Sequence, residues 1–419
     1  MNKGLLNAYC YQILWQLPNL VIIPLLAPFV ESNSIVGITK LFFIVALIYV
    51  ISDWGHSTLG AQKLVEVIGS ENKLDKIFIK GESLRVINCL ISMSIFYLAL
   101  ANGALQEGRE GYQQFLSLVG IASASQLIFP NWAIVGFQWY SKVNLTLLKM
   151  RLVTLIILFG SIFSNVPIYD CFLMYYIALL LFTLAIRYKF TKVNRLSFFI
   201  FNARSFVRLK FTDFNPGLIY VLGGISSYLT LNSGVFFADY FLGKPLAASY
   251  ATAERLLAAV RAVYLPFVQF TFVKISRKSS LISGQYQGKT RENLHITRSR
   301  LYISFLYAGL VLIIGEIYFY IFYVDPVALL CFRILIVGLA FLGISHHYVT
   351  FMLLGRGHRF LWISGLFAAL IVYVGIVVSL VFFGLMNIFI IPGAVVVAEL
   401  ILLLYGFLFS IFFLRSGYK

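Results

Sequence analysis

The stretch Leu361–Phe383 reads LWISGLFAALIVYVGIVVSLVFF, and none of its residues carries a charge. A helix that crosses a bilayer needs about 20 consecutive apolar residues, so this stretch is long enough to cross one alone. Further stretches of the same kind lie along the chain from Asn7 to Leu414. The fold is therefore decided by helices that suit a lipid environment.

The composition supports the same interpretation for the whole chain. Of the 419 residues, 60% are hydrophobic, 17% are aromatic and 12% are charged, and the mean hydropathy is +0.90. Soluble proteins average about 25% charged residues. These values exclude a soluble globular enzyme, a disordered chain and a secreted disulfide scaffold. The four cysteines stand singly within apolar stretches, where a free cysteine packs as a small hydrophobic residue.

Twelve apolar stretches, separated by charged or Gly/Pro-rich segments, are predicted to span the membrane. They are Asn7–Val30, Ile35–Ile51, Leu84–Ala101, Tyr112–Val135, Leu145–Phe163, Cys171–Ile186, Pro216–Phe237, Ser249–Val273, Leu301–Phe322, Val327–Leu354, Leu361–Phe383 and Ile388–Leu414. We therefore predict an all-α polytopic membrane protein with about 12 transmembrane helices and no room for a sizeable soluble domain.

The basic residues predict the orientation. Most of the 33 Lys and Arg residues fall in segments on one side of the predicted membrane, whereas the opposite loops contain Arg109 and Lys244. Cytoplasmic loops carry such an excess of positive charge. We therefore expect both termini in the cytoplasm. The net charge of +17 is then mainly a topology signal, and no nucleic-acid partner is expected.

The lengths of the predicted cytoplasmic loops repeat in the two halves of the chain. This repeat predicts an N-terminal six-helix bundle over residues 1–190, a basic cytoplasmic connector over 191–213 and a C-terminal six-helix bundle over 214–419. The sequence contains no GxxxxGK[ST] phosphate loop and no metalloprotease, serine-hydrolase or paired CxxC motif. We therefore expect a transporter and not an enzyme, with no catalytic residue, cofactor or metal.

The first predicted span carries a polar stripe. Four residues recur at i, i+3, i+7 and i+10, which places them on one face of a helix: Tyr9, Gln12, Gln16 and Asn19. Such a stripe either forms hydrogen bonds between helices or lines a water-filled cavity. We take Gln12, Gln16 and Asn19 as candidate substrate-binding residues. Pro18 lies in the same span, and a helix that contains proline can bend during a transport cycle.

Ionisable residues deep in a span are costly and mark candidate functional sites. Glu254 and Arg261 are seven residues apart, so both lie on one helix face, about 10 Å apart along the axis. With Arg255 they are candidates for binding an anionic substrate such as a phosphate, whose oxygens match the planar guanidinium. The alternative is a structural pair, or an arginine that reaches the membrane surface. Glu316 and Glu399 are candidate proton or sodium sites, or else protonated, hydrogen-bonded carboxyls.

Three stretches resemble a known family. They are Phe129–Trp132 with Gly136–Gln138; Ala238–Tyr240 with Ser249–Ala253 and Lys274–Arg277; and Leu354–Gly357. They are similar to segments of the polysaccharide-transporter branch of the multidrug/oligosaccharidyl-lipid/polysaccharide exporter (MOP) superfamily, and most of all to the Wzx-type O-antigen flippases. The resemblance implies a MATE-like fold in the bacterial inner (cytoplasmic) membrane.

The resemblance also implies a substrate and a mechanism. The substrate would be an undecaprenyl-diphosphate-linked oligosaccharide, moved from the cytoplasmic to the periplasmic leaflet by alternating access. Arg255 and Arg261 would bind the diphosphate, and the polar stripe would bind the sugars. Membrane lipids and the O-antigen polymerase machinery would be further partners.

The sequence is also compatible with three other functions. An ion-coupled multidrug or cation antiporter of the same superfamily would need acidic cavity groups. A flippase for the peptidoglycan lipid precursor would share the chemistry but would have more spans and a more basic cavity. A membrane-embedded polysaccharide polymerase or ligase would need a large periplasmic loop, and no predicted outer loop here is long.

Overall fold

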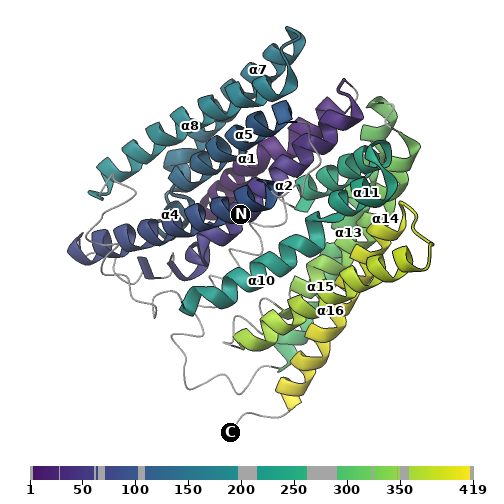
Figure 1. Ribbon diagram of the computed structural model, residues 1–419. Helices are drawn as coiled ribbons and strands as arrows, with labels where there is room; N and C mark the ends of the chain where they lie inside the picture. The colour runs from purple at the N-terminus through teal and green to yellow at the C-terminus, as the bar shows by residue number, and fades with distance from the viewer. Residues whose placement is uncertain are drawn as a thin grey trace. The chain divides into compact units, whose positions relative to one another are not determined.

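The computed structural model describes residues 3–27, 29–60, 63–64, 71–101, 109–196, 215–261, 290–322, 325–346, 348–349 and 358–415. Within these residues every regular element is a helix (Figure 1). The predicted all-α class is thereby confirmed for the described part of the chain. The chain divides into two compact units.

The first unit comprises Met1–Pro18 and Leu41–Ile225. Its helices are η1 (His56–Gly60), α4 (Glu71–Ala101), α5 (Arg109–Ile128), α6 (Asn131–Gly136), α7 (Tyr140–Phe163) and α8 (Ile168–Val193). Helices α5 and α7 both pack against α8, α4 packs against α5, and the short α6 packs against η1. Trp132 of α6 is 1% exposed, and its indole stacks on the Phe78 ring of α4.

The second unit comprises Asn19–Lys40 and Ser226–Lys419. Its helices are α11 (Gly234–Leu242), a helix over residues 244–261, α13 (Thr290–Phe322), α14 (Pro326–His346), α15 (Arg359–Phe382) and α16 (Ile390–Arg415). Helix α16 packs against both α14 and α15, and α13 packs against α14 (Figure 1). Gly315 allows α13 and α14 to approach, because a Cβ atom there would lie 1.9 Å from the Phe332 ring.

The division between the units falls inside three helices. These are α1 (Lys3–Leu26), α2 (Ser32–Asp53) and α10 (Asn215–Asn232). The predicted bundle boundaries at residues 190 and 214 stay a prediction. Residues 191–193 of the predicted connector complete α8, and residues 197–213 lie outside the described residues.

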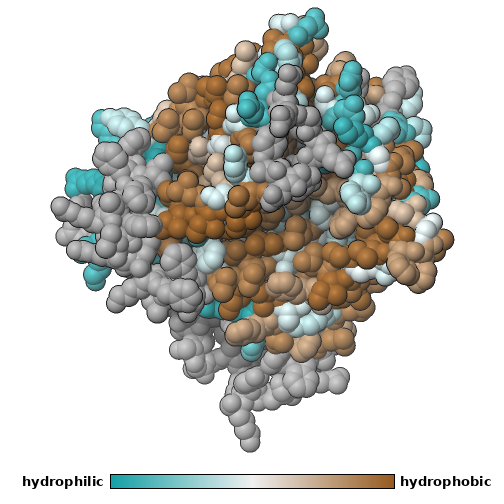
Figure 2. Space-filling view, viewed as in Figure 1, coloured by the Kyte–Doolittle hydropathy of each residue, from teal (hydrophilic) through white to brown (hydrophobic). Residues whose placement is uncertain are grey.

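Nine helices of the described part are long and apolar enough to cross a membrane. A tenth candidate is the pair Gly217–Asn232 and Gly234–Leu242, bent by 44°. Large hydrophobic side chains such as Ile156, Leu306 and Phe382 are exposed, and hydrophobic residues cover much of the face seen in Figure 2. The chain is therefore a multi-pass membrane protein. The count of 12 spans and the cytoplasmic termini stay predictions.

The bend corrects one predicted span. Pro216–Phe237 was expected to form a single helix, whereas α10 ends at Asn232 and α11 begins at Gly234. The Tyr250 hydroxyl occupies the space beside Gly234, where a Cβ atom would lie 2.2 Å from it. The break therefore occurs where a residue without a side chain lets another helix approach.

Helix α1 continues through Pro18 without a break. A proline has no N–H, so the carbonyl four residues earlier, that of Leu14, loses its intrahelical donor. Arg151 of α7 supplies one: its Nε donates to the Leu14 carbonyl at 3.3 Å, and its Nη2 donates to the Trp15 carbonyl at 3.0 Å. The guanidinium also lies over the Trp15 ring, 5.1 Å from its centroid. A buried arginine thus stabilises the helix that proline would weaken.

Candidate functional site

A buried polar cluster lies in the second unit, on the helix over residues 244–261. Tyr250, Glu254 and Arg261 follow one another at spacings of four and seven residues, so they share one face of this helix. Tyr250 is fully buried, and its hydroxyl forms no hydrogen bond within the part of the chain that the structure describes. This face directs three hydrogen-bonding groups into the interior of the unit.

Glu254 is 1% exposed, and neither of its carboxylate oxygens has a hydrogen-bond partner in the described part of the chain. The Arg255 Nη2 lies 3.9 Å from its Oε1. Buried polar groups are nearly always hydrogen-bonded, because an unpaired group loses its hydration without compensation. A buried carboxylate with both oxygens open is therefore a candidate for binding a ligand or a cation.

Arg255, unlike Glu254, forms hydrogen bonds with neighbouring helices. Its Nη2 donates to the backbone carbonyl of Thr39 at 3.2 Å, and its guanidinium also forms a hydrogen bond with the Tyr228 side chain. Arg255 is 4% exposed. These contacts fix Arg255 against α2 and α10 as part of the packing of the unit.

Arg261 is the second cation on the helix. Its Nε and Nη2 are buried and form no hydrogen bond with the residues that the structure describes. It interacts electrostatically with Glu399 of α16 and with Glu254. Glu399 is 4% exposed and accepts a hydrogen bond from Ser345 Oγ at 3.1 Å. The structure therefore brings together a substrate-binding candidate, Arg261, and an ion-coupling candidate, Glu399.

The second ion-coupling candidate lies elsewhere in the unit. Glu316 of α13 forms a two-pronged ion pair with Arg333 of α14, with distances of 2.6 Å from Nε to Oε1 and 2.9 Å from Nη2 to Oε2. The two side chains are 37% and 49% exposed. Glu316 and Glu399 thus occupy opposite environments, one exposed and paired, the other buried.

The predicted polar stripe of α1 is described only in part. Gln12 is 5% exposed. Its neighbour Tyr11 donates to Asn131 Oδ1 at 2.6 Å, and Asn131 Nδ2 donates to the Tyr49 hydroxyl at 3.0 Å. The side chains of Gln16 and Asn19 lie outside the described residues. Polar side chains on and beside α1 therefore form hydrogen bonds between helices in the first unit.

A second charged cluster, in the first unit, was missed from the sequence. Glu82 is fully buried and accepts from Arg85 at 2.7 Å, from Arg187 at 2.5 Å and from the Trp132 indole N–H at 2.7 Å. Arg85 and Arg187 are 1% and 0% exposed, so both guanidinium groups lie in the interior of the unit. The i,i+3 spacing of Glu82 and Arg85 was the available signal.

No protein-family model matches the chain, and no curated protein matches its sequence significantly. Solved structures do match. An inward-facing multidrug resistance MATE family transporter of the MOP superfamily shares 16% identity over 100% of this chain and 96% of that chain, with a TM-score of 0.70. A MOP superfamily transporter from Pyrococcus furiosus, described as having a binding pocket of reverse polarity, shares 13% identity over 100% and 96%, with a TM-score of 0.69.

An outward-facing MATE family transporter shares 13% identity over 99% of this chain and 96% of that chain, with a TM-score of 0.68. At these identities the matches define the fold alone. The chain therefore has the fold of the MATE transporters of the MOP superfamily, as the sequence resemblance implied. The structural matches do not test the narrower resemblance to the O-antigen flippases.

Proposed function

We propose that this protein is a flippase for undecaprenyl-diphosphate-linked oligosaccharide repeat units in the bacterial inner membrane. It would move them from the cytoplasmic to the periplasmic leaflet by alternating access. Three features support the proposal: a fold otherwise seen in transporters, the sequence resemblance to O-antigen flippases, and a buried arginine with open donors.

Arg261 is the observation that carries the proposal. Its Nε and Nη2 are buried, and neither forms a hydrogen bond among the described residues. These two donors form the edge of the guanidinium that matches two oxygens of a phosphate. A diphosphate that binds there would supply the missing acceptors and would compete with Glu254 and Glu399 for the arginine. Arg261 would thus bind the charged end of the substrate, while the lipid chain stays in the bilayer.

The test is a gene deletion in the native host, followed by extraction of lipid-linked sugars and assignment of their leaflet. We expect single repeat units to accumulate on the cytoplasmic face and surface polysaccharide to be lost, with both effects reversed by the intact gene. Repeat units that reached the periplasm without being polymerised would contradict flipping and would favour a polymerase.

Two variants refine the test. Arg261→Ala is expected to fail in the complementation, and Arg261→Lys to restore it only weakly, because lysine lacks the two-pronged geometry. Lys244→Ala is the matched control, since Lys244 is an exposed cation on the same helix. Equal complementation by Arg261→Ala and Lys244→Ala would contradict the role of Arg261.

A cation antiporter is the second candidate, and Glu254 is the observation that favours it. Two buried carboxyls, those of Glu254 and Glu399, lie near Arg261, and the oxygens of Glu254 have no hydrogen-bond partner among the described residues. Two of the similar structures are described as multidrug resistance transporters. Export of a cationic dye from cells that depends on the protein and is lost in Glu254→Gln would support this candidate. Dye export unaffected by the gene would exclude it.

A further inference from the structure

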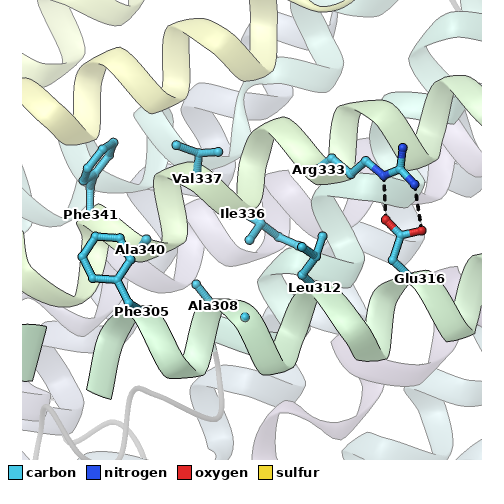
Figure 3. A pocket seen from close by; sticks show the side chains of 10 residues that line it. Phe305, Ala308, Leu312, Glu316, Arg333, Ile336, Val337, Ala340 and Phe341 are labelled. Atoms are coloured by element: carbon cyan, nitrogen blue, oxygen red, sulfur yellow. Dashed lines mark hydrogen bonds and ion pairs between the residues drawn. The ribbon is translucent and has the colours of Figure 1, made fainter. Parts of the chain in front are cut away.

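A groove of about 420 Å³ runs along α13 and α14 of the second unit. Its two ends differ in chemistry, as Figure 3 shows. The Glu316–Arg333 ion pair lies at one end, and Phe305 and Phe341 lie at the other. Between them the lining is apolar and includes Gly309, Leu312 and Ile336. The groove is thus polar at one end and apolar along the rest of its length.

The ion pair is unusual for its surroundings. Side chains beside it on α13, such as Ile313 and Ile317, are more than half exposed, as expected for a face in contact with lipid. Charged groups at such a face are costly and mark a functional site by default. The pair uses Nε and Nη2 of Arg333. The pair therefore leaves Nη1 of Arg333 outside its two hydrogen bonds.

The place of the pair along the helices matches the orientation of a membrane lipid. Arg333 lies seven residues after the start of α14, and Glu316 lies six residues before the end of α13. Both are therefore about 10 Å from the end where the two helices join. From there the apolar part of the groove runs toward the middle of the helices. A lipid with its headgroup at the ion pair would have its chain directed along this part.

We propose that the groove binds phosphatidylethanolamine. The phosphate would accept from Nη1 of Arg333, the ammonium would donate to the Glu316 carboxylate, and one acyl chain would lie between Phe305 and Phe341. A pair of opposite charges matches a headgroup that also carries both charges. Phosphatidylcholine has no N–H to donate, and phosphatidylglycerol has no cation for Glu316.

The test uses the purified full-length protein, stripped of lipid in detergent and titrated with each of the three lipids during native mass spectrometry. Phosphatidylethanolamine is expected to bind about tenfold more tightly than the other two, which is the order of effect of one hydrogen bond to a charged group. Equal binding of the three lipids, or preferred binding of phosphatidylglycerol, would overturn the proposal.

Two sets of variants locate the binding. Gly309→Leu fills the groove, and because no atom lies within 4 Å of a Cβ built there, the helix can accept the side chain. Gly375→Leu on α15 is the matched control, since its Cβ position is equally open. We expect Gly309→Leu alone to lose the bound lipid. Identical lipid binding by the two variants would overturn the proposal.

The charge variants keep the proposal testable if Gly309→Leu fails to fold. Glu316→Gln is expected to abolish the preference for phosphatidylethanolamine over phosphatidylcholine while lipid still binds. Arg333→Gln is expected to weaken binding of every phospholipid, because all of them carry the phosphate. An unchanged headgroup preference in Glu316→Gln would contradict the assigned contact.

Discussion

Arg187 Nη1 lies 2.5 Å from Glu82 Oε2, and the two residues are 105 positions apart in the sequence. This contact joins α8 to α4 in the interior of the first unit. Glu82 also accepts from Arg85 and from the Trp132 indole, so three helices meet at one carboxylate. Both oxygens of Glu82 are thus paired within the cluster, which acts as a structural centre of the unit.

Removal of the carboxylate is expected to destabilise this unit strongly. Glu82→Ala leaves two buried guanidinium groups without their anion, and breaking a buried ion pair in this way costs about 3–5 kcal/mol. The unfolding midpoint in detergent, followed by tryptophan fluorescence, measures the effect. Glu316→Ala, at an exposed ion pair, is the comparison and should shift the midpoint far less. Equal shifts would contradict a structural role for the Glu82 cluster.

Arg151 and Pro18 are expected to be coupled. Arg151→Met removes the donors to the Leu14 and Trp15 carbonyls, at a cost of about 1–3 kcal/mol for an unsatisfied buried carbonyl. In Pro18→Ala the alanine N–H can donate to the Leu14 carbonyl. Arg151→Met should therefore destabilise the Pro18→Ala protein less than it destabilises the native protein. Hydrogen exchange of α1 in the four proteins of this double-mutant cycle measures the coupling. Additive effects would contradict the interpretation that Arg151 compensates for the proline.

His56 predicts a dependence of stability on pH. Its ring packs against Trp132 with centroids 5.5 Å apart, its Nδ1 lies 2.6 Å from the Asp53 carbonyl, and burial lowers its pKa. A histidine whose pKa is lower in the folded than in the unfolded state stabilises the fold above the unfolded pKa of about 6.5. That contribution is lost as the pH falls through the folded pKa.

The unfolding midpoint of the native protein should therefore decrease between about pH 7 and pH 5, a range that includes the unfolded pKa of histidine. In His56→Gln the decrease should be smaller, since glutamine does not titrate. The midpoint as a function of pH in both proteins is the measurement. Parallel curves for the two proteins would show that His56 does not contribute.

The helices were predictable because lipid requires long apolar segments. The predicted span Leu145–Phe163 corresponds to α7, Tyr140–Phe163, and Leu361–Phe383 corresponds to α15, Arg359–Phe382. Helix α4 shows the limit of this approach. It begins at Glu71, whereas the apolar run begins at Leu84, so Glu82 was placed in a loop. Oppositely charged side chains that pair with each other can extend a helix beyond its apolar residues. A hydropathy profile counts each charge as unfavourable and does not detect the pairing.

The part of the candidate site that lies on a single helix was predictable from the sequence. The spacing of Glu254 and Arg261 placed both on one face, and both lie in the same buried cluster. The approach of Glu399 and its hydrogen bond with Ser345 depend on the packing of α16 against α14, which no local pattern contains. For the same reason the contact of Arg255 with the Thr39 carbonyl, 216 positions away, was not predicted.

The most direct test of the proposed function is translocation of a diphosphate-linked oligosaccharide lipid in vesicles that contain only the purified protein. Loss of lectin-accessible sugar from the outer leaflet measures the rate. We predict translocation by the native protein and by Lys244→Ala, and a rate at least about tenfold lower for Arg261→Ala, equivalent to about 1.4 kcal/mol. No translocation by the native protein, or equal rates for the two variants, would contradict the account.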